Sequence, residues 1–261
     1  MSVSPTPEMI PAERRTRIVE ALEAQRAVKV ATLSAALGVS EITIRRDLMT
    51  LEREGLLART YGGAVLRKRL TDDSGHEGAE GKHVAEKARI AKAAAAMIEP
   101  RDTVFLGSGT TVAQILRYVD PELEARVVTP SLGAAAEAQG LRLEMVFLGG
   151  LYRPQLNAVE GTWPLEMIAQ FHADKAFLGA DGLDSKAGLT TPSIAVAGIE
   201  LAMIRRTRGE VVVLADNNKI GLVCQVVICP LDQIDVVLVD TGVDRKVRDE
   251  IQRAGPRCEA V

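Results

Sequence analysis

The residues Val30–Val65 read VATLSAALGVSEITIRRDLMTLEREGLLARTYGGAV, and they decide the fold of the N-terminal part of the chain. A segment with apolar residues at helical spacing ends at Gly38, and a second begins at Ser40, a residue type that favours a helix N-cap. A hairpin that turns at Gly62-Gly63 follows. Two helices joined by a glycine turn and followed by such a wing place the second helix in the major groove of DNA. The stretch therefore predicts a winged helix-turn-helix.

The segments around this stretch extend the predicted domain to residues 1–66. A first helix is expected over residues 12–25, with Ile18 and Leu22 one turn apart, and a second over residues 31–37. The recognition helix is expected over residues 40–54, where Ile44, Leu48 and Leu51 recur at the spacing of a buried face. The wing would occupy residues 56–66.

The start of the predicted recognition helix carries side chains that can read base edges. Arginine pairs with guanine through two hydrogen bonds, glutamate accepts from cytosine, and threonine contacts a thymine methyl group or a phosphate. Arginines outside this helix suit phosphates, which position a protein on DNA without reading its sequence. The sequence leaves open which of Arg45 and Arg46 points at the bases. We expect base contacts from Ser40, Glu41, Thr43, Arg45 and Arg46, and phosphate contacts from Arg14, Arg15, Arg59 and Arg67.

Charge is divided unevenly along the 261 residues. Residues 1–70 carry 12 Lys and Arg against 8 Asp and Glu, a net charge of +4, and residues 71–261 carry 20 against 27, a net charge of −7. This division indicates that only the N-terminal part contacts a polyanion.

The composition also excludes several classes of protein. A run of about eighteen apolar residues, the length of a membrane span, is absent, and the N-terminus MSVSPTPEMIPAERR lacks the apolar stretch of a secretory signal. The three cysteines and three histidines have no metal-ligand spacing. We expect a cytoplasmic protein without a metal or cofactor.

The remainder of the chain predicts a larger domain. Residues 67–82, RKRLTDDSGHEGAEGK, have the composition of a flexible linker, and residues 83–261 alternate strand-like and helical segments. Such alternation is typical of an open, mainly parallel α/β sheet with helices on both faces. Strands are expected at 103–106, 126–129, 144–148, 175–178, 211–215, 226–229 and 236–239, and helices at 83–99, 111–119, 131–139, 194–208 and 244–253.

The string GVSEITIRRDLMTLEREGLLARTYGGAV resembles the N-terminal signature of the DeoR family of bacterial transcriptional regulators. Further motifs fall in the order of that family's sensor domain: GSGTT at 107–111, TPSLGAA at 129–135, FLGG at 147–150, AFLGADGLD at 176–184 and LADNNKIG at 214–221. The resemblance implies a sensor domain similar in fold to ribose-5-phosphate isomerase and coenzyme A transferases, which typically binds phosphorylated sugars.

The same motifs suit a phosphorylated ligand on chemical grounds. Backbone amides and hydroxyl groups in a glycine-rich turn between strand and helix favour an anion, and a lysine neutralises phosphate. Carboxylates at strand ends suit sugar hydroxyls, and glycines let a ligand approach the backbone. The expected effector-binding residues are Ser108, Gly109, Thr110, Thr111, Gly149, Gly150, Asp181, Asp184 and Lys219.

An alternative function is a sugar-phosphate isomerase with a DNA-binding head. Asp181, Asp184 and Lys219 could perform acid–base chemistry. The glycine-rich lysine segment of the isomerase is replaced here by SKAGLTTPS, which contains Lys186 without the triple glycine. We therefore expect binding without catalysis.

The chain departs from the family pattern at several positions near the expected ligand. Gly107 stands where an acidic residue is usual, and Pro130 where asparagine is usual. Ala197 and Gly198 lie where an acidic residue is common, although Glu200 is nearby. These changes predict an atypical effector, or one that is bound more through its phosphate than through its hydroxyl groups.

Together these patterns predict a repressor of a carbohydrate operon. The expected partners are operator double-stranded DNA, a phosphorylated sugar or sugar alcohol, and further copies of the chain in a dimer or tetramer, because helix-turn-helix proteins usually read paired half-sites.

Overall fold

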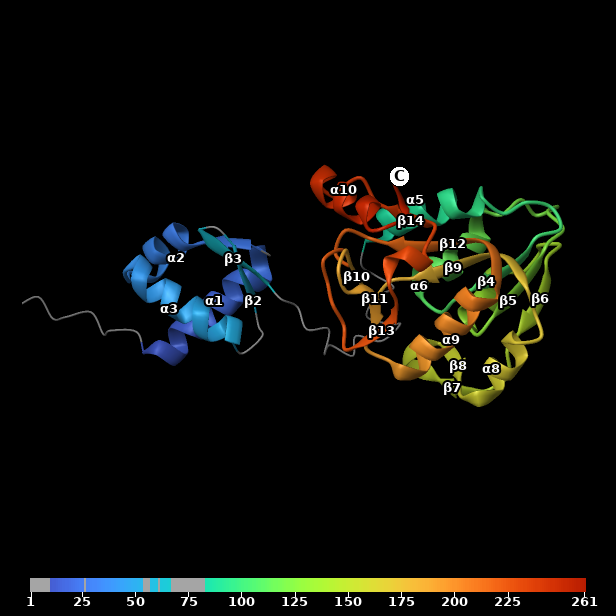
Figure 1. Ribbon diagram of the computed structural model, residues 1–261, viewed down its shortest axis with the longest axis horizontal. Helices are drawn as coiled ribbons and strands as arrows, with labels where there is room; N and C mark the ends of the chain where they lie inside the picture. Colours follow the sequence, from blue (N-terminus) through green and yellow to red (C-terminus); the bar gives the residue numbers. More distant parts are fainter. Residues whose placement is uncertain (1–9, 26, 54–56, 61, 67–82) are drawn as a thin grey trace, which may run out of the picture. The chain divides into compact units, whose positions relative to one another are not determined.

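The computed structural model describes residues 10–25, 27–53, 57–60, 62–66 and 83–261. The chain divides into two compact units, Met1–Arg69 and Leu70–Val261, and each is considered by itself (Figure 1). The expected linker over residues 67–82 lies outside the described residues. Within them, no helix is long and apolar enough to cross a membrane.

The N-terminal unit is a winged helix-turn-helix, which confirms the prediction for this part of the chain. Its three strands form an antiparallel sheet in the order β1-β3-β2. Strand β1 was not expected from the sequence, because three residues are too few to display a periodic pattern. The elements are α1 (Pro11–Gln25), β1 (Ala27–Lys29), α2 (Val30–Leu37), α3 (Glu41–Arg53), β2 (Leu57–Thr60) and β3 (Gly63–Leu66).

The core of this unit follows the helical spacing of its apolar residues. Ile44, Leu48 and Leu51 of α3 are at most 2% exposed and pack with Ile18 and Leu22 of α1. Burial of each such side chain stabilises the unit by about 1.5–3 kcal/mol. The opposite face of α3 is therefore left for solvent or for a partner.

The glycines at the two turns are required for different reasons. Gly38 ends α2 in the left-handed region, at a φ of 66°. Gly63 permits a close approach, because a Cβ there would lie 2.1 Å from the carbonyl oxygen of Val28 in β1. The double glycine of the wing therefore allows β3 to pair with β1.

The C-terminal unit is built on a seven-stranded sheet in the order β15-β14-β12-β9-β4-β5-β6. Every pair of neighbouring strands in it is parallel. This confirms the expected open α/β sheet. The strands are β4 (Thr103–Leu106), β5 (Arg126–Thr129), β6 (Glu144–Phe147), β9 (Ala173–Gly179), β12 (Thr207–Ala215), β14 (Val236–Val239) and β15 (Arg257–Ala260).

Helices cover both faces of the sheet, so its central strands are apolar on both sides (Figure 1). Successive residues of β4 alternate between the faces: Val104 and Leu106 pack in one core with α5, and Phe105 packs in the other with α9. The first face carries α5 (Val84–Ala95), α6 (Thr110–Ala113), a 3-10 helix (Gln114–Tyr118) and α7 (Gly133–Glu137), and the second carries α8 (Thr162–Ile168), α9 (Ile194–Arg206) and α10 (Arg245–Arg253).

Two smaller antiparallel sheets accompany the large one, and they change one prediction. The expected strand at 226–229 is present as β13 (Val226–Cys229), but it pairs with β11 in the order β10-β11-β13 instead of joining the parallel sheet. Its apolar residues suit either location, so the pattern did not distinguish them. The other strands of these sheets are β7 (Leu151–Arg153), β8 (Ala158–Glu160), β10 (Gly182–Asp184) and β11 (Gly188–Thr191).

The strand order changes direction between β4 and β9. From β4 the chain proceeds outward to β5 and β6, whereas β9 lies on the other side of β4 and leads to β12. The loops that leave β4 and β9 therefore diverge at their carboxyl ends. Ligands of open α/β sheets bind in the crevice at such a point.

Candidate DNA-binding surface and effector site

The first turn of α3 is closed by its own side chains. The backbone N–H of Thr43 donates to Ser40 Oγ at 3.2 Å, and the two hydroxyl oxygens lie 2.9 Å apart. Ser40 therefore caps the recognition helix, as its residue type indicated. Both hydroxyl groups lie at the end of α3 that is expected to face base edges.

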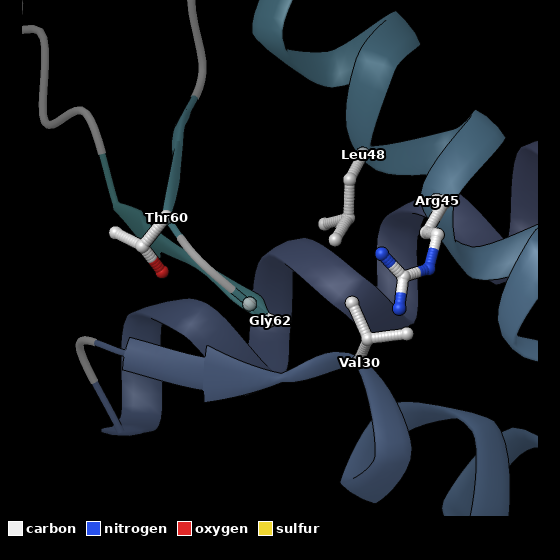
Figure 2. A pocket seen from close by; sticks show the side chains of 6 residues that line it. Val30, Arg45, Leu48, Thr60 and Gly62 are labelled. Carbon is white, nitrogen blue, oxygen red and sulfur yellow. The ribbon is translucent and has the colours of Figure 1, made fainter.

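The side chain of Arg45, on α3, faces the space between this helix and the wing. It lines a hollow of about 210 Å³ with Val30, Leu48, Thr60 and the two wing glycines. Figure 2 shows its guanidinium extending from α3 toward Val30 at the start of α2, with Gly62 at the wing turn facing the same space.

An ion pair on the surface of α3 joins Arg45 to Glu41. Arg45 Nη2 lies 3.2 Å from Glu41 Oε2 one turn earlier, and both side chains are at least half exposed. Such a pair stabilises a helix by less than about 1 kcal/mol, so either partner can exchange it for a nucleic-acid contact. Arg46 is also exposed.

Arg14 is the arginine whose expected role the structure corrects. Its Nε lies 2.5 Å from Asp47 Oδ2, and the two residues are only 8% and 5% exposed. Arg14 therefore joins α1 to the inner face of α3, instead of facing a phosphate. Arg15 is half-buried on α1. Arg59 has its backbone in β2, and its side chain, like the whole of Arg67, lies outside the described residues.

The glycine-rich loop GSGTT follows β4 as expected, but the helix after it is short. Ser108, Gly109, Thr110 and Thr111 are all partly exposed, and Gly109 has a φ of 124° that only glycine adopts readily. The predicted helix over 111–119 is split into α6, with four residues, and a 3-10 helix. A helix dipole therefore contributes little here, and the amide and hydroxyl groups of the loop are its main donors.

Lys87 is a residue of this site that the sequence reading missed. It lies on α5 and is 4% exposed, and its Nζ donates to Thr110 Oγ1 at 3.2 Å. Lys87 and Thr110 are 23 positions apart, so no local motif connects them. The contact places a cation directly beside the loop that suits an anion.

Two carboxyl groups lie near the point where β4 and β9 diverge. Asp181 follows β9, and its Oδ2 accepts a hydrogen bond from Thr191 Oγ1 at 2.8 Å. Glu200 lies on α9 and is 3% exposed. Burial, and secondly the charge of Asp181, raise the pKa of Glu200 well above its ordinary value. The sequence reading noted Glu200 but did not include it among the expected site residues.

Lys219 lies in the loop after β12. Its carbonyl oxygen accepts a hydrogen bond from the backbone N–H of Leu183 at 2.9 Å, which holds this loop against the segment after β9. Burial raises the pKa of the nearby Cys224 thiol; Asp181 adds to that rise and Lys219 opposes it. Asp181 and Lys219 therefore lie near the same thiol.

The remaining expected residues take part in local contacts. Gly150 is needed for packing, because a Cβ there would lie 2.7 Å from the carbonyl oxygen of Glu160. Gly149 is exposed, and its N–H points at Met167 Sδ at 3.2 Å. Asp184 lies at the β10–β11 turn, where its Oδ1 accepts hydrogen bonds from the backbone of Lys186 and Ala187. Asp184 therefore stabilises a turn. It was expected instead to lie at the carboxyl end of the sheet.

A second hollow, of about 700 Å³, lies at the opposite edge of the sheet, at the amino ends of β4, β5 and β6. Arg101, Arg126 and Arg142 line it together with Glu124 and Glu144. Arg126 is already paired with Glu144 at 2.7 Å. This hollow contains none of the expected effector residues. Among the described residues, no group of three His, Cys, Asp or Glu side chains could hold a metal ion.

Comparison with known proteins agrees with this architecture. The DeoR-like helix-turn-helix domain matches residues 14–69, and the DeoR C terminal sensor domain matches residues 82–241. The HTH-type transcriptional regulator GlpR of Haloferax volcanii is 34% identical over 247 residues, which cover 95% of this chain and 96% of that protein.

Two further similar proteins differ in how much of the chain they cover. A putative aga operon transcriptional repressor of Escherichia coli O157:H7 is 32% identical, over 93% of this chain and 91% of that protein. A ribose 5-phosphate isomerase A from Methanocaldococcus jannaschii is 22% identical and has a TM-score of 0.38, over 51% of this chain and 53% of that one. The chain belongs to the DeoR family and is a transcriptional regulator, not an enzyme, with a helix-turn-helix DNA-binding domain and a C-terminal sensor domain.

Proposed function

We propose that this protein represses an operon of carbohydrate metabolism and that a phosphorylated sugar or sugar alcohol controls its binding to operator DNA. The observation that carries the effector half is the contact between the buried Lys87 and Thr110 of the GSGTT loop. Asp181 follows the neighbouring strand β9 at the same edge of the sheet. The names of two relatives, a putative aga operon repressor and the transcriptional repressor AccR of Agrobacterium fabrum, support repression as the sign of control.

The DNA-binding half rests on the free face of α3. Ser40, Glu41, Thr43, Arg45 and Arg46 lie on the exposed side of this helix or at its start, away from the core formed by its apolar face. Arginine contacts with guanine would supply sequence discrimination, and Arg15 and Arg59 would contact phosphates. Two such units reading paired half-sites require at least a dimer, so we include a dimer or tetramer in the proposal.

Binding of the effector requires protein groups for its phosphate and for its sugar hydroxyl groups. The phosphate would accept hydrogen bonds from the amides and hydroxyl groups of Ser108–Thr111 and lie beside Lys87 and Lys219. The hydroxyl groups of the sugar would donate hydrogen bonds to Asp181, which already accepts one from Thr191 Oγ1. A ligand that bridges these groups would join the loops after β4, β9 and β12.

Helix α5 joins this site to residues 67–82, the part of the sequence that follows the DNA-binding unit. It is the first described element after residues 67–82, and contacts join it to two of the site's loops. Nε2 of His83, the N-cap residue of α5, lies 2.7 Å from Asn218 Nδ2, and Lys87 contacts Thr110. A ligand that rearranges either loop would change these contacts. The free energy of such coupling is the difference in the ligand's affinity for the two arrangements.

A gel-shift titration tests the proposed function. The full chain is incubated with DNA from upstream of its own gene and of neighbouring operons, and phosphorylated sugars and sugar alcohols are then added. We expect a retarded band that at least one phosphate ester releases and that the matching unphosphorylated sugar leaves intact. A band that no ester of the set releases or strengthens would count against effector control.

A further inference from the structure

One oxygen of the Glu200 carboxyl group is buried without a partner among the described residues. This atom, Oε2, is fully enclosed, and the residue as a whole is 3% exposed. Buried polar atoms in folded proteins are nearly always hydrogen-bonded, so an unpaired carboxyl oxygen calls for a physical reason. Either the group stores strain or a bound molecule completes it.

The position of Glu200 favours a bound molecule. Its Oε1 lies 3.2 Å from the point that a Cβ on Gly107 would occupy. Gly107 is the first residue after β4, and its N–H donates to the carbonyl oxygen of Phe177 in β9 at 2.9 Å. The carboxyl group of Glu200 therefore reaches the place where β4 and β9 diverge, and the absence of a side chain at Gly107 leaves room for it.

The surroundings of Glu200 favour the neutral form of its carboxyl group. Asp181, from the loop after β9, and Cys229, from β13, both interact with it electrostatically. Burial is the largest cause that raises the pKa of the Cys229 thiol to about 12, so this thiol is neutral and brings no charge to Glu200. No ion pair with a lysine or arginine is formed by Glu200 among the described residues. A protonated carboxyl group both donates and accepts a hydrogen bond.

We propose that Glu200 is a specificity-determining residue of the effector site, whose carboxyl group donates a hydrogen bond to a hydroxyl group of a phosphorylated polyol. This inference rests on the proposed function, because it requires the phosphate of the ligand to lie at Ser108–Thr111. Asp181 then accepts from a neighbouring hydroxyl group, and the two carboxyl groups divide the roles of acceptor and donor. A ligand with an ammonium group would instead form an ion pair with charged Glu200.

The test compares Glu200→Gln with Glu200→Ala by isothermal titration of the full chain. Wild type is first screened by thermal shift with ribose 5-phosphate, glucitol 6-phosphate, glucose 6-phosphate and glucosamine 6-phosphate, and the most stabilising ester is used for all variants. Glutamine matches the shape and hydrogen-bonding of a protonated carboxyl group, so Glu200→Gln is expected to keep Kd within about 3-fold, and Glu200→Ala to raise it by about 10-fold or more. Glu166→Gln, on the exposed surface of α8, is the matched control.

Each outcome distinguishes the inference from the proposed function. If no ester stabilises wild type, the proposed effector class itself is wrong. If an ester binds wild type and Glu200→Ala equally, Glu200 has no role in binding and the proposed function stands. If Glu200→Gln weakens binding as much as Glu200→Ala, the charged form binds, and the neutral-acid assignment is overturned.

A second variant leaves Glu200 intact. Gly107→Ala would place a Cβ 3.2 Å from Glu200 Oε1 and 3.2 Å from Leu178 Cδ2, which displaces the carboxyl group. We expect it to weaken binding of the same ester and to leave the Kd for inorganic phosphate unchanged. An unchanged Kd for the ester would contradict the proposed placement. Inorganic phosphate also serves as the folding control for the Glu200 variants.

Discussion

Lys87 Nζ donates a hydrogen bond to Thr110 Oγ1 at 3.2 Å and thereby joins the first described helix after residues 67–82 to the loop at the end of β4. In the proposed function, this contact contributes to the chemistry of that loop and to the response of α5 to a ligand. A buried ammonium group beside a set of backbone amides favours an anion at the loop.

Replacing Lys87 with Met is expected to weaken effector binding by about 10-fold or more, because a hydrogen bond to a charged group contributes about 1.5–3 kcal/mol. Operator binding in the absence of effector should persist. Isothermal titration with the selected phosphate ester measures the first effect and a gel shift the second. Lys92→Met, on the exposed side of the same helix, is the control. An unchanged effector affinity in Lys87→Met would remove this lysine from the site.

Thr110→Val and Lys219→Ala are each expected to reduce the effector response while DNA binding survives. Valine keeps the shape of Thr110 but removes the hydroxyl group, so its effect should be the smaller, about 1 kcal/mol or 5-fold in affinity. The effector concentration that releases half of the operator measures both. Normal release in both variants would contradict the assignment of the two loops to the effector.

Arg45→Ala and Arg46→Ala are expected to weaken operator binding without unfolding the N-terminal unit, because both side chains are exposed. An arginine with two hydrogen bonds to guanine contributes about 1–3 kcal/mol of discrimination. Gel shifts at fixed salt measure the loss, and circular dichroism checks the fold. Arg245→Ala, on the exposed surface of the C-terminal unit, is the control. Unchanged binding in both variants would show that α3 is not the recognition helix.

The buried pair of Arg14 and Asp47 is expected to act on stability instead of on DNA contacts. Removing one partner leaves an uncompensated buried charge, so Arg14→Ala or Asp47→Ala should each lower the free energy of unfolding by about 3–5 kcal/mol. The double variant should lose less than the sum of the single losses. Urea unfolding of the four proteins measures this cycle. Additive losses would mean that the two side chains do not interact.

Glu200 is expected to make stability depend on pH. Its pKa in the folded protein is raised above the ordinary value of 4.5, so the folded state binds more protons than the unfolded state above that pH. Protonation of Glu200 therefore stabilises the folded state. This contribution to the free energy of unfolding is fully present below the ordinary pKa and is lost as the pH rises toward the pKa in the folded protein. The Tm of wild type should therefore fall relative to that of Glu200→Gln as pH rises from 5 to 8. Parallel Tm curves would contradict a raised pKa.

The sequence predicted those features that depend on neighbours along the chain. The winged helix-turn-helix follows from the spacing of Ile44, Leu48 and Leu51 and from the glycines at the turns, and the parallel sheet follows from alternating strands and helices. β13 was found as a strand but not as a member of a separate sheet, because a short apolar strand looks the same in either place. The role of Arg14 was missed since a charged side chain on a helix carries no local sign of burial.

The sequence by itself therefore determined the class of each unit, the exposed face of the recognition helix and the glycine-rich loop after β4, because hydrophobic periodicity and turn chemistry are local properties. Only the tertiary structure decided which groups converge. It joined Lys87 to Thr110 across 23 positions, aimed Glu200 of α9 at Gly107 and assigned Asp184 to a turn. The physical reason is that strand order and helix packing set these distances, and neither is encoded in the spacing of residues within a single segment.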